Sequence, residues 1–81
     1  MLTPLEEHIR TVFSRILDTH EIDVNRSFFE QGGTSLKVLQ VVYLLQQNVR
    51  TASVDINLFF DTLSVTRLAQ AIEAAGQQNV T

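Results

Sequence analysis

The chain has 81 residues, a formal net charge of −3 and no cysteine. A chain of this length forms one domain with a small core, and the lack of cysteine excludes disulfide bonds and thiolate metal sites. Scattered basic residues in an acidic chain argue against a nucleic-acid partner. No apolar run approaches the about 20 residues that cross a bilayer, so we expect no membrane partner.

The first predicted helix begins at Pro4. Thr3 can cap it, proline suits the first helical position, and Glu6 completes a capping box. Apolar residues then recur at helical spacing, at Leu5, Ile9, Val12, Phe13, Ile16 and Leu17. We expect the helix to fade near Thr19. This N-terminal stretch is acidic and amphipathic, unlike a signal peptide, and we expect a cytoplasmic protein.

A long connection follows at residues 20–34. A connection of this length without regular structure is uncommon and is often functional. It carries four apolar residues that need burial, so we predict an ordered loop pinned by its aromatic rings. These residues are Ile22, Val24, Phe28 and Phe29. Gly32 and Gly33 follow, and their lack of a side chain would let another protein approach closely.

The second helix is predicted from Ser35 to about Gln47, with Ser35 as a good N-cap residue. A short third element covers residues 56–60. The last helix begins at Ser64, which we expect to cap it, and Gly76 is a stop signal. Its apolar face consists of Val65, Leu68, Ala69, Ile72 and Ala75.

These elements predict an all-α fold, a small four-helix bundle with three main helices and a short third one. We expect one domain over residues 1–76 and a flexible tail over residues 77–81. The composition agrees, because the chain has only one proline and three glycines.

The second helix carries two apolar stripes. At about 100° per residue, one stripe contains Val38, Val41, Val42 and Leu45, and the other contains Leu36, Leu39 and Tyr43. A surface helix of a small bundle needs only one. Either the helix is central and buried all round, or the second stripe stays partly exposed and docks partners. The second stripe begins directly after Ser35, which favours docking.

Ser35 itself allows three interpretations. As a nucleophile it would need a general base, and neither His8 nor His20 has the sequence context of a catalytic triad. The G-x-S-x-G elbow, phosphate-binding loops and metal-ligand spacings are also absent, so we do not expect an enzyme. As a helix cap it would leave the two glycines and the spare stripe unexplained. As an attachment point it would place a phosphate at a helix N-terminus, which favours negative charge.

The run Phe28-Phe29-Glu30-Gln31-Gly32-Gly33-Thr34-Ser35-Leu36 resembles the attachment motif of thiolation domains. These are the peptidyl carrier proteins of nonribosomal peptide synthetases and the related acyl carrier proteins of polyketide synthases. The typical motif is F-F-E-L-G-G-x-S-L, from which only Gln31 departs. The C-terminal part resembles L-F-x-x-P-T-x-x-x-L-A more loosely. Leu63 replaces its proline, which we expect to blur the turn before the last helix.

The resemblance implies the acyl or peptidyl carrier fold. It also implies that a phosphopantetheinyl transferase moves 4′-phosphopantetheine from coenzyme A onto Ser35. The thiol of this group would hold aminoacyl, peptidyl or acyl units as thioesters. The chain, as a monomer, would present them to adenylation or acyl-loading, condensation or ketosynthase, and thioesterase or tailoring enzymes.

Partner contacts in this family cluster on the second helix after the serine, on the loop before it and on the third helix. Carried over, they imply partner-binding roles for Thr34, Leu36, Leu39, Gln40 and Tyr43. Core roles are expected for Phe28, Phe29, Val38, Val41, Val42 and Leu45. The second helix has no acidic residue and contains Lys37, which favours the nonribosomal peptide type. The alternative is an unmodified interaction module that docks through Leu36, Leu39 and Tyr43.

Overall fold

The computed structural model describes residues 1–78, with side chains through Gly76, and residues 79–81 lie outside this part. The described residues form no strand. They form four α-helices: α1 (Pro4–Leu17), α2 (Ser35–Gln46), α3 (Ile56–Thr62) and α4 (Val65–Gln78). Two short 3-10 turns, η1 (Phe29–Gln31) and η2 (Val49–Thr51), interrupt the connections. The predicted all-α bundle with a short third helix is confirmed.

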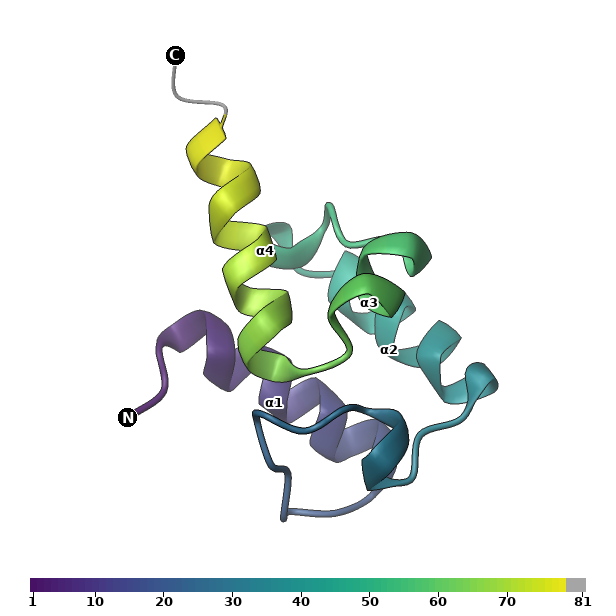
Figure 1. Ribbon diagram of the computed structural model, residues 1–81. Coiled ribbons are helices and arrows are strands. Elements are labelled where there is room, and N and C mark those ends of the chain that lie inside the picture. Colours follow the sequence, from purple (N-terminus) through teal and green to yellow (C-terminus); the bar gives the residue numbers. More distant parts are fainter. Residues whose placement is uncertain (79–81) are drawn as a thin grey trace.

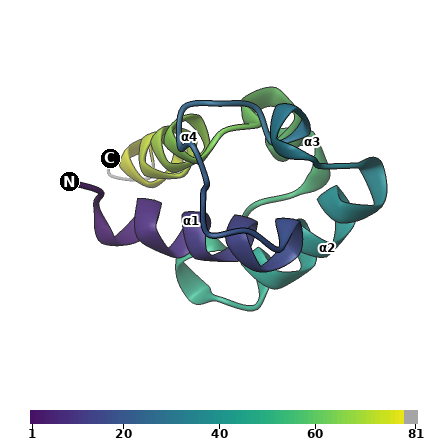
Figure 2. The ribbon, with the colours of Figure 1, turned by 90° about the horizontal axis from the view of Figure 1, so that it is seen from below.

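The four helices enclose one core. α1 packs against α2 and α4, and α3 packs against the same two helices from the other side. Figure 2 shows the helices arranged as a ring, with the long loop after α1 crossing in front of α4 toward α3. The buried side chains point to the centre of this ring: Ile9, Val12, Phe13, Phe28, Val38, Val41, Val42, Leu45, Val54, Phe59, Val65, Leu68 and Ala69. Figure 1 shows the same helices from the side, with α4 leading to the C-terminus.

Three phenylalanine rings occupy the centre of the core. The ring of Phe28, from the loop, meets Phe13 of α1 at 5.1 Å and Phe59 of α3 at 5.3 Å, both edge to face. Pairs with this geometry add about 0.5–1.5 kcal/mol beyond the burial of their area. Phe28 therefore anchors the loop to the bundle, as the sequence predicts.

The helix ends follow their capping residues. At α1 the Thr3 hydroxyl accepts from the Glu6 N–H at 3.1 Å, and the Glu6 carboxylate accepts from the Thr3 N–H at 2.8 Å, as expected for a capping box. The Ser64 hydroxyl accepts from the Arg67 N–H, which confirms the predicted cap of α4. α4 continues to Gln78, past the predicted stop at Gly76. Of the predicted tail, residues 79–81 lie outside the described part.

The turn between α3 and α4 is well defined, contrary to the expectation drawn from the missing proline. Leu63 adopts the left-handed conformation with φ 62°, and its N–H donates to the Phe59 carbonyl. Its own carbonyl accepts from the Phe28 N–H at 2.7 Å and so ties the loop to this turn. Proline cannot take this conformation, because its ring fixes φ near −65°. Here leucine forms a different turn rather than a blurred one.

Candidate functional site

The two glycines before Ser35 each have a reason within the fold. Gly32 has a φ of 105°, a conformation that side-chain-bearing residues rarely adopt. Gly33 lies against Phe28, where an added Cβ would come within 2.3 Å of the ring and 2.7 Å of the carbonyl oxygen. The Gly33 N–H also donates to that carbonyl at 3.0 Å. The anchored ring thus fixes the backbone two residues before Ser35.

Thr34, and not Ser35, is the N-cap of α2, so the predicted cap is wrong by one residue. Thr34 has extended backbone angles, and its hydroxyl accepts from the Lys37 N–H at 3.2 Å. Its carbonyl accepts from the Val38 N–H. Both residue types are good caps, so local preference alone could not separate them. The consequence is that Ser35, the first helical residue, is not needed as a cap.

The Ser35 side chain is exposed at the start of a 12-residue helix. Its hydroxyl has no hydrogen-bond partner among the described residues, and neither do the N–H groups of Ser35 and Leu36. Unpaired N–H groups at a helix start, together with the helix dipole, attract an anion. Ser35 therefore combines an accessible hydroxyl with a helix N-terminus that favours negative charge.

Gln31 departs from the typical motif, and sequence reasoning assigned it no role. Its side-chain oxygen accepts from the Asp23 N–H at 2.8 Å, and its amide nitrogen donates to the carbonyls of Asp23 and Arg26. These bonds close the segment between residues 23 and 31 into a compact loop. Glutamine at this position can do so, whereas leucine has no polar atoms in its side chain.

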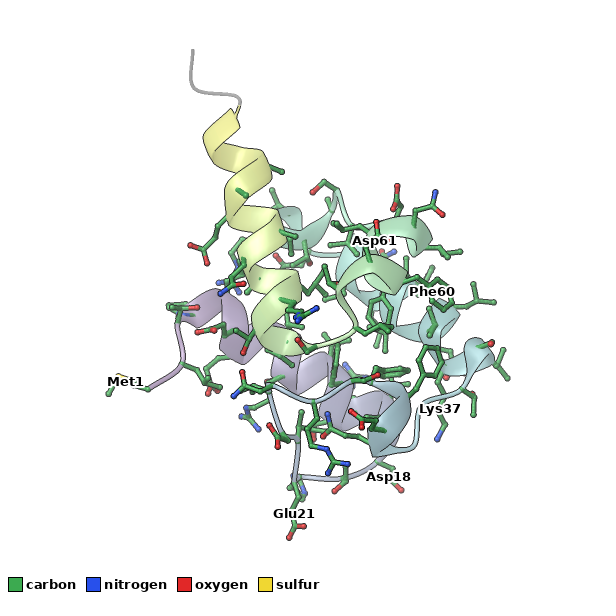
Figure 3. All side chains as sticks on the ribbon, in the orientation of Figure 1. Met1, Asp18, Glu21, Lys37, Phe60 and Asp61 are labelled. Atoms are coloured by element: carbon green, nitrogen blue, oxygen red, sulfur yellow. The ribbon has the colours of Figure 1, made fainter. Side chains whose placement is uncertain are left out.

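Phe29 is not a core residue, which corrects the prediction. It is 37% exposed, and its ring stacks on Phe60 of α3, which is 44% exposed, with ring centroids 6.0 Å apart. The partner ring comes from a distant part of the sequence, so the pattern around Phe29 could not reveal it. The pair joins the loop before Ser35 to α3 at the surface; Figure 3 labels Phe60 and the nearby Asp61.

α2 separates its two apolar stripes as the docking interpretation requires. Val38, Val41, Val42 and Leu45 are buried, whereas Leu36, Leu39 and Tyr43 are 66%, 50% and 64% exposed. The interpretation in which α2 is buried all round is therefore wrong. Gln40 is exposed beside this stripe. The structure thus places Thr34, Ser35, Leu36, Leu39, Gln40 and Tyr43 on the surface of one helix and its cap.

His8 packs near the opposite end of α2 from Ser35. Its Nε2 lies 3.4 Å from the hydroxyl of Thr51, a buried residue whose hydroxyl donates to the carbonyl of Leu45 near the end of α2. Burial, and then the positive charge of Arg50, lower the pKa of His8. Within residues 1–78, side chains of metal-ligand type do not gather in groups of three or more. No described helix has the length and apolarity to cross a membrane.

The chain is similar in sequence to one protein family and to several known proteins. Residues 7–72 match the family described as "Phosphopantetheine attachment site". The chain is 32% identical over 94% of its length to a component of the linear gramicidin synthase of Brevibacillus parabrevis. It is 31% identical over 86% of its length to tyrocidine synthase 3 of the same organism. A shorter similarity, 43% over 52% of the chain, relates it to bacitracin synthase 2 of Bacillus licheniformis. The chain spans only 1% to 2% of the length of these relatives.

Proposed function

The chain belongs to the phosphopantetheine attachment-site family, so it is a carrier domain, and on this premise we propose that Ser35 is its attachment residue. The observation that carries the proposal is that the Ser35 side chain is exposed and is not used to cap the helix. It is exposed at the first position of α2, and the cap that it could have supplied comes from Thr34. An unmodified docking module would give no reason for an exposed serine directly after Thr34, which already caps the helix.

In the attachment reaction the chain supplies only the nucleophilic oxygen of Ser35. The Ser35 oxygen attacks the phosphorus of coenzyme A that bears the pantetheine. The oxygen–phosphorus bond forms as the pyrophosphate bond to that phosphorus breaks, and adenosine 3′,5′-bisphosphate leaves. The serine proton passes to a base of the transferase. When bound, 4′-phosphopantetheine supplies a thiol that holds acyl groups as thioesters.

The residues around Ser35 fit the phosphodiester that results. Its negative charge would lie at the N-terminus of α2, beside the unpaired N–H groups of Ser35 and Leu36. A charge in this position gains about 0.3–1 kcal/mol from the helix dipole. The first turn of α2 contains no acidic residue that would oppose it. Lys37 adds a positive charge in the same turn, and Figure 3 shows it at the edge of the molecule.

We place this carrier in nonribosomal peptide synthesis, with aminoacyl or peptidyl cargo. The names of the relatives, gramicidin, tyrocidine and bacitracin synthases, support this assignment. The partners would be a phosphopantetheinyl transferase and the loading, condensing and releasing enzymes of a synthetase, all in the cytoplasm. They would dock on Thr34, Leu36, Leu39, Gln40 and Tyr43. The chain would be a monomer that presents its cargo and catalyses no step.

The test is a mass measurement after incubation with coenzyme A, Mg²⁺ and a broad-specificity phosphopantetheinyl transferase. The wild-type chain should gain the mass of one phosphopantetheinyl group. The Ser35→Ala variant should gain nothing, while Ser53→Ala, which removes another exposed serine, should behave as wild type. An unchanged wild-type mass, or an equal gain in Ser35→Ala, would refute the proposal.

A further inference from the structure

Leu39 and Tyr43 form a ridge along α2 that separates two grooves. The first groove lies between α1 and α2, where Arg15, Ile16, Gln40 and Leu44 complete its lining. The second lies between α2 and α3, where Val42, Gln46, Asp55, Ile56 and Asn57 complete it. Both grooves share the two ridge residues. A protein that covers the ridge therefore contacts residues of both grooves at once.

The two grooves carry charges of opposite sign. Arg15 is the one charged residue that lines the first groove, and Asp55 is the one that lines the second. Within the described part of the chain the only ion pair joins Arg10 and Glu7, so neither charge is compensated by the protein itself. One Asp55 oxygen caps α3 by accepting from the Leu58 N–H, which leaves the carboxylate its charge.

We infer that the phosphopantetheinyl transferase docks on this ridge in a single orientation set by Arg15 and Asp55. Its surface would have an apolar depression for Leu39 and Tyr43, an acidic group facing Arg15 and a basic group facing Asp55. The inference rests on the proposed function of Ser35. Charges at the rim of an interface mainly orient the partner and raise its association rate, whereas the apolar centre supplies affinity.

The distances along α2 suit an enzyme that must reach Ser35. At 1.5 Å per residue, Leu39 lies about 6 Å and Tyr43 about 12 Å along the helix axis from Ser35. An enzyme seated on the ridge has its active site within reach of the first turn. Turned end for end over the ridge, the same enzyme would bring like charges together at Arg15 and Asp55. The charge pair thus disfavours the orientation that would aim the active site away from Ser35.

The experiment measures kcat/KM for transfer from coenzyme A by the same transferase at several salt concentrations. Arg15→Gln and Asp55→Asn remove the charges, and asparagine still caps α3. At low salt each variant should lose about three- to tenfold in kcat/KM, because steering by charge is lost. The difference from wild type should shrink as salt screens the charges. Arg15→Lys should retain the wild-type rate.

Matched controls remove equal charges from α4, which lines neither groove. Arg67→Gln and Glu73→Gln should leave the rate and its salt dependence unchanged. The inference is overturned if Arg15→Gln and Asp55→Asn behave as these controls, or if their deficit persists at high salt. That result would leave the attachment at Ser35 intact. A wild-type chain that is not modified would instead overturn the proposed function, and this inference with it.

Discussion

The two faces of α2 differ in what they do for the molecule. The face with Val38, Val41, Val42 and Leu45 is buried against the rest of the bundle, and the face with Leu36, Leu39 and Tyr43 is exposed. Both are apolar, so hydrophobicity does not distinguish them. What distinguishes them is whether the chain supplies something to pack against. Folding alone therefore does not account for the exposed face, and the proposed docking of partner enzymes would account for it.

The largest effect is expected from the two phenylalanines that precede the site. Phe28→Ala should destabilise the domain by about 3–5 kcal/mol, because it empties the centre of the core. Phe29→Ala should cost less, about 1–3 kcal/mol, because Phe29 is half-buried and loses two aromatic pairs, one with Phe60 and one with Phe28. Urea denaturation of both variants measures the difference. Equal losses would contradict the division between buried and exposed rings.

The same substitution at two leucines of α2, one on each face, compares the buried face with the exposed face. Leu45→Ala should cost about 2–5 kcal/mol because Leu45 is fully buried. Leu39→Ala should change stability by no more than about 0.5 kcal/mol. It should nevertheless slow the transferase reaction, because it removes one of the two apolar side chains of the ridge. Thermal denaturation and transfer kinetics on the same samples separate the two effects. A large loss of stability in Leu39→Ala would place Leu39 in the core.

Gly33→Ala tests the contact that links the buried ring to the exposed site. The added methyl would collide with the Phe28 ring and its carbonyl, and overpacking of this kind costs about 1–3 kcal/mol. Gly76→Ala is the matched control in α4, where an added Cβ meets nothing within 4 Å. That variant should be neutral or gain up to about 1 kcal/mol, because alanine favours helix. A neutral Gly33→Ala would show that the loop is not held by Phe28.

The smallest effect concerns His8, which packs beside η2. Burial and Arg50 lower its pKa in the folded state below the ordinary value of 6.5. The unfolded chain therefore binds the proton more readily, and folding stability should fall as pH drops from above 6.5 towards the lowered pKa. His8→Gln should remove this slope in the melting temperature, measured from about pH 7.5 down to about pH 5. The same slope in the variant would contradict the assignment to His8.

Helix positions and the core could be predicted because their causes are local in the sequence. The capping box at Thr3 and Glu6 and the period of the stripes of α2 depend on residues three or four apart. The exposure of the second stripe followed because the other helices already bring faces of their own. The same local reasoning, supported by the motif, singled out Ser35.

The errors came from contacts between distant segments or from choices between neighbours. Phe29 stacks on a ring from α3, far along the sequence, and Gln31 bonds to a backbone eight positions earlier. Nothing in the local pattern reveals either contact. Thr34 and Ser35 are both good caps, so local preference does not decide between them, and the structure assigns the cap to Thr34. Around the site, side-chain contacts across the loop override local preference.

The measurement that tests the account most directly is the location of the added group. Trypsin cleaves after Arg26 and Lys37 and releases the peptide of residues 27–37, which contains three hydroxyl residues, Ser27, Thr34 and Ser35. After transfer from coenzyme A, fragmentation of this peptide in a mass spectrometer should place the phosphopantetheinyl group on Ser35. A group located on Ser27 or Thr34, or on any other peptide, would contradict the claim that the exposed first residue of α2 is the attachment point.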